Sequence, residues 1–237
     1  YPELYSRIKD AVKSGNWELQ GGMWIEADCN LISGESMVRQ LLHGKNFFKD
    51  EFDVVVDNLW LPDVFGYSAA LPQILKRAGV DYFLTQKLSW SQFNDFPYHT
   101  FNWRGIDGTE ILTHFPPENT YNSELDTEFL LPAQKGFKEK DKLNEFISLF
   151  GVGDGGGGPK PENIELGRRM SSLENSPRVQ FDMAKNFFER LDKNKDNLET
   201  WVGELYLELH RGTLTTHGLV KKQNRKLEWK LRSVEML

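Results

Sequence analysis

The sequence predicts an α/β fold in which a parallel, barrel-like sheet carries functional loops on one rim. Short apolar runs typical of strands alternate along the chain with amphipathic runs typical of helices. Polar residues and glycines gather directly after several of the apolar runs, where the loops of such a fold build active sites. The length of 237 residues and the 39% apolar content are those of a soluble globular domain.

The expected elements follow from hydrophobic periodicity and from turn residues. The chain opens on a helical pattern with Leu4, Ile8 and Val12 on one face. Strands are expected over Trp17–Gln20 running into Met23–Ile25, Asp53–Leu59, Asp81–Thr85, Phe146–Val152, Arg178–Phe181 and Leu205–Leu209. Helices are expected over Gly34–Leu42, Ser68–Ala78, Glu162–Leu173 and Ala184–Leu191.

Three further segments depart from this alternation. Asn102–Ile106 and Glu110–Phe115 flank Asp107-Gly108 and predict a β-hairpin. Pro116–Lys142 is polar and irregular, which suits a rim loop. From Leu219 onward the pattern becomes a charged amphipathic helix.

Composition excludes some partners. The net charge of −6 argues against nucleic acid, and the basic run at 221–226 is explained by a solvated helix face. No run has the length of a membrane span, so no membrane partner is expected. A single cysteine, Cys29, and the lack of any Asn-x-Ser/Thr acceptor favour a reducing compartment such as the cytoplasm.

Two carboxylates and one histidine are the candidate chemical groups. Asp63 follows an apolar run and could serve as nucleophile, base or ligand, or simply as a loop or helix-capping residue. Asp154 lies in Gly153-Asp154-Gly155-Gly156-Gly157-Gly158. This run lacks the Gly-Lys-Ser/Thr of a nucleotide-binding loop. The simpler alternative to a functional loop is a flexible turn with a solvated carboxylate. His210 ends an apolar run, where a histidine is more often a hydrogen-bonded core residue than a ligand.

The run Leu59-Trp60-Leu61-Pro62-Asp63-Val64-Phe65-Gly66-Tyr67-Ser68 resembles the nucleophile motif of family 38 glycoside hydrolases, the class II α-mannosidases. The order of the other motifs agrees with the family, and the cytosolic and vacuolar branch is the most similar. These motifs are Gly21–Asn30, Ser33–Gln40, Phe83–Trp90, Phe101–Trp103, Gly105–Gly108, Gly153–Pro159 and Glu208–Thr213.

The resemblance implies roles for individual residues. Asp63 would be the nucleophile and Asp154 the general acid/base of a retaining mechanism. Lys87 matches a position that holds a cation near the nucleophile, although it could also be a rim lysine without a partner. Aromatic walls for the sugar could come from three residues for which core packing is the equal alternative: Phe65, Trp90 and Tyr121.

The resemblance also implies a metal. His210 and Asp63 would be two ligands of a His₂Asp₂ site for Zn²⁺, which also tolerates Co²⁺. The family's other two ligands come from a His-x-Asp pair upstream, and no His-x-Asp occurs in these residues. We therefore expect an excerpt, with residues 1–210 forming an incomplete catalytic domain and 211–237 starting a helical middle domain.

The function predicted from the sequence is hydrolysis of mannose-containing oligosaccharides by a retaining α-mannosidase. The expected location is the cytoplasm, with a vacuolar or lysosome-like compartment as the alternative, and any homo-oligomer would form through domains absent here. Two other functions stay open. One is a metal-dependent carbohydrate deacetylase, which needs no strand-end nucleophile, and the other is a non-catalytic sugar-binding fragment.

Overall fold

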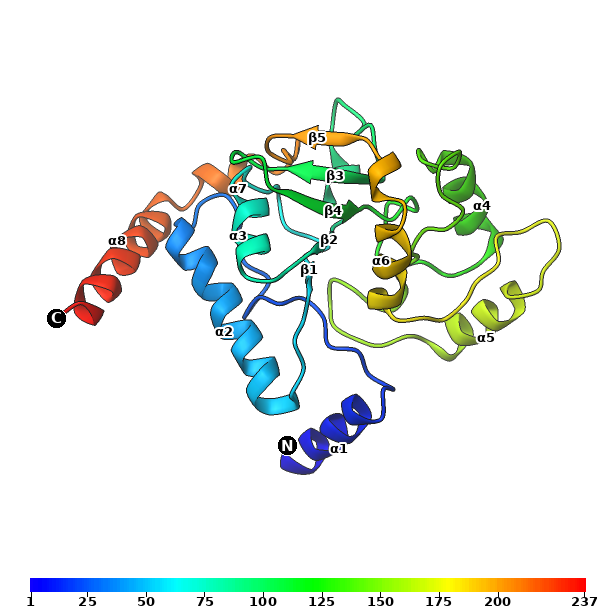
Figure 1. Ribbon diagram of the computed structural model, residues 1–237, viewed down its shortest axis with the longest axis horizontal. Helices are drawn as coiled ribbons and strands as arrows, with labels where there is room; N and C mark the ends of the chain where they lie inside the picture. The colour runs from blue at the N-terminus through cyan, green and yellow to red at the C-terminus, as the bar shows by residue number, and fades with distance from the viewer.

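The computed structural model describes all 237 residues, and its centre is a five-stranded sheet (Figure 1). The strand order is β1-β2-β4-β3-β5, with β1 and β5 at the edges. Three of the four pairings are parallel, and the antiparallel one joins β3 to β4. The α/β class with a mostly parallel sheet is therefore confirmed. The strands are β1 (Asn58–Trp60), β2 (Tyr82–Leu84), β3 (Thr100–Arg104), β4 (Glu110–His114) and β5 (Thr200–Val202).

Helices surround this sheet. The α-helices are α1 (Pro2–Lys13), α2 (Gly34–Phe52), α3 (Leu71–Arg77), α4 (Thr127–Gly136), α5 (Pro161–Met170), α6 (Ala184–Asp192), α7 (Gly212–Thr215) and α8 (Gly218–Glu235). Two 3₁₀ turns, η1 (Lys87–Trp90) and η2 (Lys195–Asn197), complete the set. No helix in this set combines the length and apolar character that crossing a membrane requires.

The two faces of the sheet build two separate cores. Side chains alternate between the faces of a strand, so Phe83 packs with α2 and α3 while its neighbour Leu84 packs with α6. In β4, Ile111 likewise packs in the first core and Leu112 in the second. Figure 1 shows α2 and α3 on one side of the strands and α6 on the other. This double cover is what a parallel sheet requires.

Helix α2 illustrates how local sequence fixes an element. The Ser33 side chain accepts the Ser36 N–H at the first turn, and Asp53 closes the last turn in the left-handed conformation, with φ 57°. Helix α2 is therefore ten residues longer than the predicted Gly34–Leu42. The predicted strand Asp53–Leu59 is correspondingly shortened, because pairing begins only at Asn58 and Val55 is exposed.

Four predicted strands are wrong, and the reason is shared. A strand needs a neighbouring strand to complete its hydrogen bonds, and these extended segments bond elsewhere. The Ile147 N–H donates to the ring of His114, Ser123 N–H donates to the Leu149 carbonyl, and Leu205 forms only an isolated bridge with Tyr67. The four segments are Trp17–Gln20 with Met23–Ile25, Phe146–Val152, Arg178–Phe181 and Leu205–Leu209.

Of the remaining predicted elements, most are confirmed and one is wrong in part. The hairpin is confirmed as β3 and β4, and α3, α5 and α6 overlap their predicted ranges. The predicted rim loop Pro116–Lys142 is wrong in part, since Asp126 caps α4 inside it through the N–H groups of Glu128 and Phe129. Strand β5 was not predicted.

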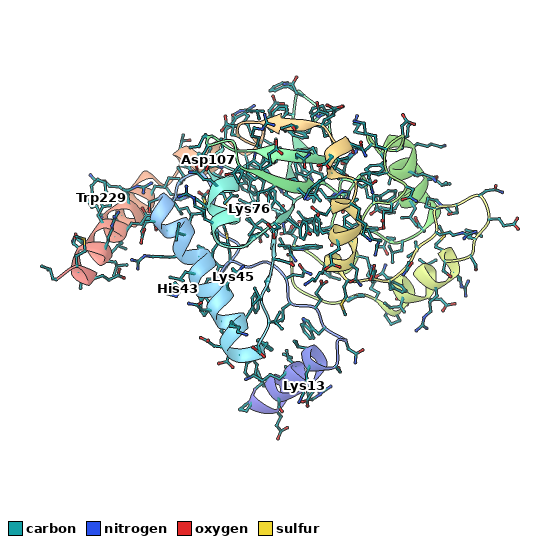
Figure 2. The ribbon with its side chains drawn as sticks, in the orientation of Figure 1. Lys13, His43, Lys45, Lys76, Asp107 and Trp229 are labelled. Atoms are coloured by element: carbon teal, nitrogen blue, oxygen red, sulfur yellow. The ribbon has the colours of Figure 1, made fainter.

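Helix α8 leaves the body of the molecule beside the start of α2 (Figure 1). Its Glu228 accepts hydrogen bonds from Ser33 N–H and Ser36 Oγ, and its Glu235 pairs with Arg39. Figure 2 shows Trp229 on this helix, well away from the sheet, and the side chain is exposed. The predicted C-terminal helix is therefore confirmed, and it attaches to the body through polar contacts.

Candidate functional site

Asp63 lies where β1 leaves the sheet. The Leu61 N–H still donates to the Leu84 carbonyl, and the chain then turns through Pro62. Lys87 occupies the matching place after β2, the parallel neighbour of β1. The ends of adjacent parallel strands meet at one edge, so the Lys87 Nζ reaches the Asp63 Oδ1 at 2.6 Å.

The Lys87 side chain is buried, with 5% of its surface exposed, whereas the Asp63 side chain keeps 32%. A buried ammonium needs a partner, because burial removes its hydration. Two rings complete its surroundings, with the Trp90 centroid 3.9 Å and the Phe65 centroid 5.0 Å from Nζ. Lys87 is therefore no free rim lysine, and Asp63 is more than a capping residue.

His210 joins the same cluster through its ring. The ring centroid lies 4.8 Å from that of Phe65 and 6.2 Å from that of Trp90. The side chain is exposed and the backbone is left-handed, with φ 53°, so His210 is no hydrogen-bonded core residue. The segment before it is not a strand, yet Leu205 and Leu207 are buried and fix the place where His210 emerges.

Asp154 approaches from a different part of the chain. It is exposed, has a φ of 58°, and lies among glycines in a loop without regular structure. Asp63 and Asp154 nevertheless line one cavity of about 1360 Å³. Tyr121 and Glu26 line it too, so two carboxylates from distant segments face a common space.

Tyr121 lines the same cavity as the two carboxylates. Partial burial and the negative charges of Asp63 and Asp154 raise the pKa of its phenol, which therefore stays protonated as a hydrogen-bond donor. Its ring packs on the backbone of Gly153, where a Cβ would come within 2.2 Å of the Tyr121 Cε2. Asn122 accepts the Gly153 N–H at 2.7 Å. Tyr121 thus connects the Asp154 loop to the Asp63 side of the cavity.

The structure places the seven predicted site residues in two groups that share Asp63. Asp63, Lys87, Phe65, Trp90 and His210 form a connected cluster, and Asp63, Tyr121 and Asp154 share the cavity. Core packing does not account for Trp90, whose side chain is 48% exposed. Each aromatic residue has a contact specific to this site.

Sequence reasoning did not assign three residues that support the site. Glu26 Oε1 accepts the Asp63 N–H at 3.2 Å, and Asn30 Nδ2 donates to the Phe65 carbonyl at 3.1 Å. Glu208 accepts the N–H groups of Phe93 and Asn94 and so holds the loop after Trp90. All three lie in motifs that matched a known family, and that position was the only available signal.

The residues do not complete a metal site. The chain contains no group of three or more His, Cys, Asp or Glu side chains placed to hold an ion. Asp63 and His210 are linked only indirectly, because His210 packs on Phe65, Phe65 lies beside the Lys87 ammonium, and that ammonium pairs with one oxygen of Asp63. A catalytic zinc ion ordinarily takes three protein ligands, so these two side chains are too few.

The sequence matches one protein family and several of its characterised members. Residues 1–204 match the model of the glycosyl hydrolases family 38 N-terminal domain. Over all 237 residues the chain is 47% identical to alpha-mannosidase G of Dictyostelium discoideum and 48% identical to alpha-mannosidase 2C1 of Homo sapiens. It spans 22% and 23% of those proteins.

A solved structure confirms the fold. An alpha-mannosidase from Enterococcus faecalis superposes with a TM-score of 0.63 at 23% identity, covering 86% of this chain and 24% of that one. At this identity the likeness establishes the fold alone.

Proposed function

Since the chain belongs to glycosyl hydrolase family 38, we propose that it carries the two catalytic carboxylates of a retaining α-mannosidase. The observation that supports this most directly is the Asp63–Lys87 ion pair at the edge of the sheet, facing a cavity that Asp154 also lines. A strand-end carboxylate paired with a buried cation suits a nucleophile that must be held in one orientation. An exposed carboxylate on a glycine loop suits an acid/base that exchanges protons with water.

The proposed reaction has two steps. In the first, an Asp63 oxygen forms a bond to the anomeric carbon while the bond from that carbon to the glycosidic oxygen breaks, and Asp154 gives its proton to the departing oxygen. In the second, the Asp154 carboxylate removes a proton from water, the water oxygen bonds to the anomeric carbon, and the Asp63 carboxylate is released. A retaining mechanism of this kind needs the carboxyl groups about 5–5.5 Å apart.

The surrounding residues have supporting roles in this proposal. Lys87 balances the charge of Asp63 before attack and after release. Phe65 and Trp90 lie beside that pair and offer ring faces to the sugar. Tyr121 keeps its proton, so it can donate a hydrogen bond to a carboxylate or to a sugar hydroxyl.

Zinc binding, with Co²⁺ as the substitute, is also a proposal. Asp63 and His210 would contribute two donors, and the ion would help to orient sugar hydroxyls when bound. Since two ligands hold zinc weakly, we expect these 237 residues by themselves to bind Zn²⁺ poorly.

The wider proposals follow from the sequence. We propose a mannose-containing oligosaccharide as substrate, a boundary between catalytic and helical regions at residue 210, and a cytoplasmic location. The buried single thiol of Cys29 fits a reducing compartment, and burial raises its pKa to about 12, so it stays an unreactive thiol. Fractionation of cells that express the tagged full-length protein tests the location.

The decisive experiment is covalent trapping. A mannoside with a fluorine at C2 and a good leaving group should label the full-length protein, and peptide mass mapping should place the sugar on Asp63. A carbohydrate deacetylase would release acetate and form no glycosyl adduct. A sugar-binding fragment would bind the mannoside without releasing the leaving group.

A further inference from the structure

The loop that carries Asp63 is held at its two ends by other parts of the fold. Before it, the Leu61 N–H bonds to the Leu84 carbonyl, and after it, Tyr67 and Leu205 exchange two backbone hydrogen bonds. Between these ends the backbone makes two further hydrogen bonds, from the Gln86 N–H to the Pro62 carbonyl at 3.4 Å and from the Gly66 N–H to the Val64 carbonyl at 3.0 Å, and neither includes the N–H of Asp63. The direction of the Asp63 side chain therefore depends on what else holds the loop.

Residues 26–30, which we call the brace, supply that support. The Glu26 Oε1 accepts the Asp63 N–H at 3.2 Å. The Asn30 Nδ2 donates to the carbonyl oxygens of Phe65, at 3.1 Å, and of Gly66, at 3.3 Å. The brace thus contacts the loop on both sides of Val64, at one donor and two acceptors.

The brace is itself well fixed. Ala27 and Cys29 are buried in the core, with 3% and 1% of their surface exposed. The Asp28 Oδ1 accepts the N–H groups of Asn30, at 2.9 Å, and Leu31, at 2.6 Å. Ala27 and Cys29 therefore anchor the brace in the core, Asp28 fixes the turn that follows it, and Glu26 and Asn30 reach the Asp63 loop. This is the arrangement expected of a supporting shell.

We propose that Glu26 and Asn30 are positioning residues for the Asp63 nucleophile, an inference that rests on the proposed hydrolase function. Glu26 acts as a hydrogen-bond acceptor for the Asp63 backbone, so its oxygen matters and its charge does not. Asn30 acts as a donor, fixing the carbonyls of Phe65 and Gly66. A displacement of about 1 Å in the attacking group can reduce the rate about 100-fold.

The test uses paired variants of the full-length protein with an activated aryl mannoside. Glu26→Gln retains an oxygen that accepts the Asp63 N–H, and Glu26→Ala removes it. Asn30→Asp keeps the shape but replaces both amide hydrogens with an oxygen that repels the two carbonyls. Asn16→Ala is the control, because its side chain is exposed and donates only to Ser14 Oγ.

We expect Glu26→Gln to stay close to the wild-type kcat, and Glu26→Ala and Asn30→Asp to lose about 10- to 100-fold in kcat with little change in KM. Thermal unfolding should show that all four variants fold. The slow variants should still be labelled by the 2-fluoro mannoside on Asp63, at a reduced rate.

Two results would overturn the inference while leaving the proposed function intact. One is equal damage from Glu26→Gln and Glu26→Ala, which would make the Glu26 charge the active feature. The other is a kcat for Glu26→Ala and Asn30→Asp that stays close to wild type. Failure of the wild-type protein to hydrolyse or trap the mannoside would instead refute the proposed function, and the positioning role with it.

Discussion

The two carboxylates of the proposed mechanism are held in opposite ways. Asp63 follows a sheet strand, pairs with a buried lysine and has its backbone N–H bound by Glu26. Asp154 lies exposed in a glycine loop, with a left-handed backbone of φ 58°. A nucleophile must meet one carbon in one orientation, whereas an acid/base must reach both the leaving oxygen and the incoming water. The difference in support matches this difference in task.

The largest expected effect comes from removing the fixed carboxylate. In the full-length protein, Asp63→Asn should keep the fold and lose turnover by about 10⁴-fold or more, since covalent catalysis loses its attacking group. Steady-state kinetics with an aryl mannoside, and circular dichroism for the fold, measure this. Activity within tenfold of the wild type would refute the nucleophile assignment.

The proposed metal contributes to the same fixed side. His210→Ala in the full-length protein should lower the bound zinc, because the exposed imidazole would be one of only two donors from this region. Metal analysis after dialysis gives the content directly, and a chelator should inactivate the wild-type protein. The 237 residues alone should bind Zn²⁺ weakly by calorimetry. Full zinc content in His210→Ala would show that the histidine is no ligand.

Replacing Asp154, the carboxylate with fewer contacts, should affect some substrates more than others. Asp154→Ala should reduce hydrolysis by about 10²–10⁴-fold for mannosides with poor leaving groups, and far less for aryl mannosides that need little protonation. Added azide should restore turnover of the aryl substrate and yield a mannosyl azide. Equal losses on both substrates, with no effect of azide, would contradict the acid/base role.

The sequence predicted the fixed side of the site better than it predicted the fold around it. Asp63 and Lys87 follow strands β1 and β2, which local sequence patterns predict. Because these two strands are parallel neighbours, the residues that follow them lie close together. Strand assignments failed at segments such as Phe146–Val152, because an apolar run does not reveal whether a partner strand lies beside it. Glu26 and Asn30 were not assigned for a related reason: their contacts lie more than thirty residues away along the chain.

Tyr121 tests whether the two sides act as one site. Its phenol is near both carboxylates, and its pKa lies above the ordinary 10.0, so it donates a proton throughout the neutral range. Tyr121→Phe should lower kcat about tenfold, equivalent to one hydrogen bond of roughly 1.4 kcal/mol. The alkaline limb of the pH profile up to pH 10 should stay unchanged. A lost or shifted alkaline limb would mean that Tyr121 itself titrates during turnover.

The smallest effects should come from the glycines beside Asp154. Substituting them tests whether the backbone conformation of this loop places the Asp154 carboxylate. A methyl group added at Gly155 would meet open space on a backbone of ordinary φ, whereas Gly156 has a φ of +70°. Gly155→Ala should therefore be neutral or stabilising by about 0.4–1 kcal/mol, and Gly156→Ala should strain the loop by about 1–2 kcal/mol. Since the loop has few contacts, most of that strain should move Asp154 and leave global unfolding little changed. We accordingly expect Gly156→Ala to slow hydrolysis of poor leaving groups a few-fold with an almost constant Tm, and Gly155→Ala to do neither. Equal kinetics in the two variants would show that the left-handed backbone at residue 156 has no part in placing the acid.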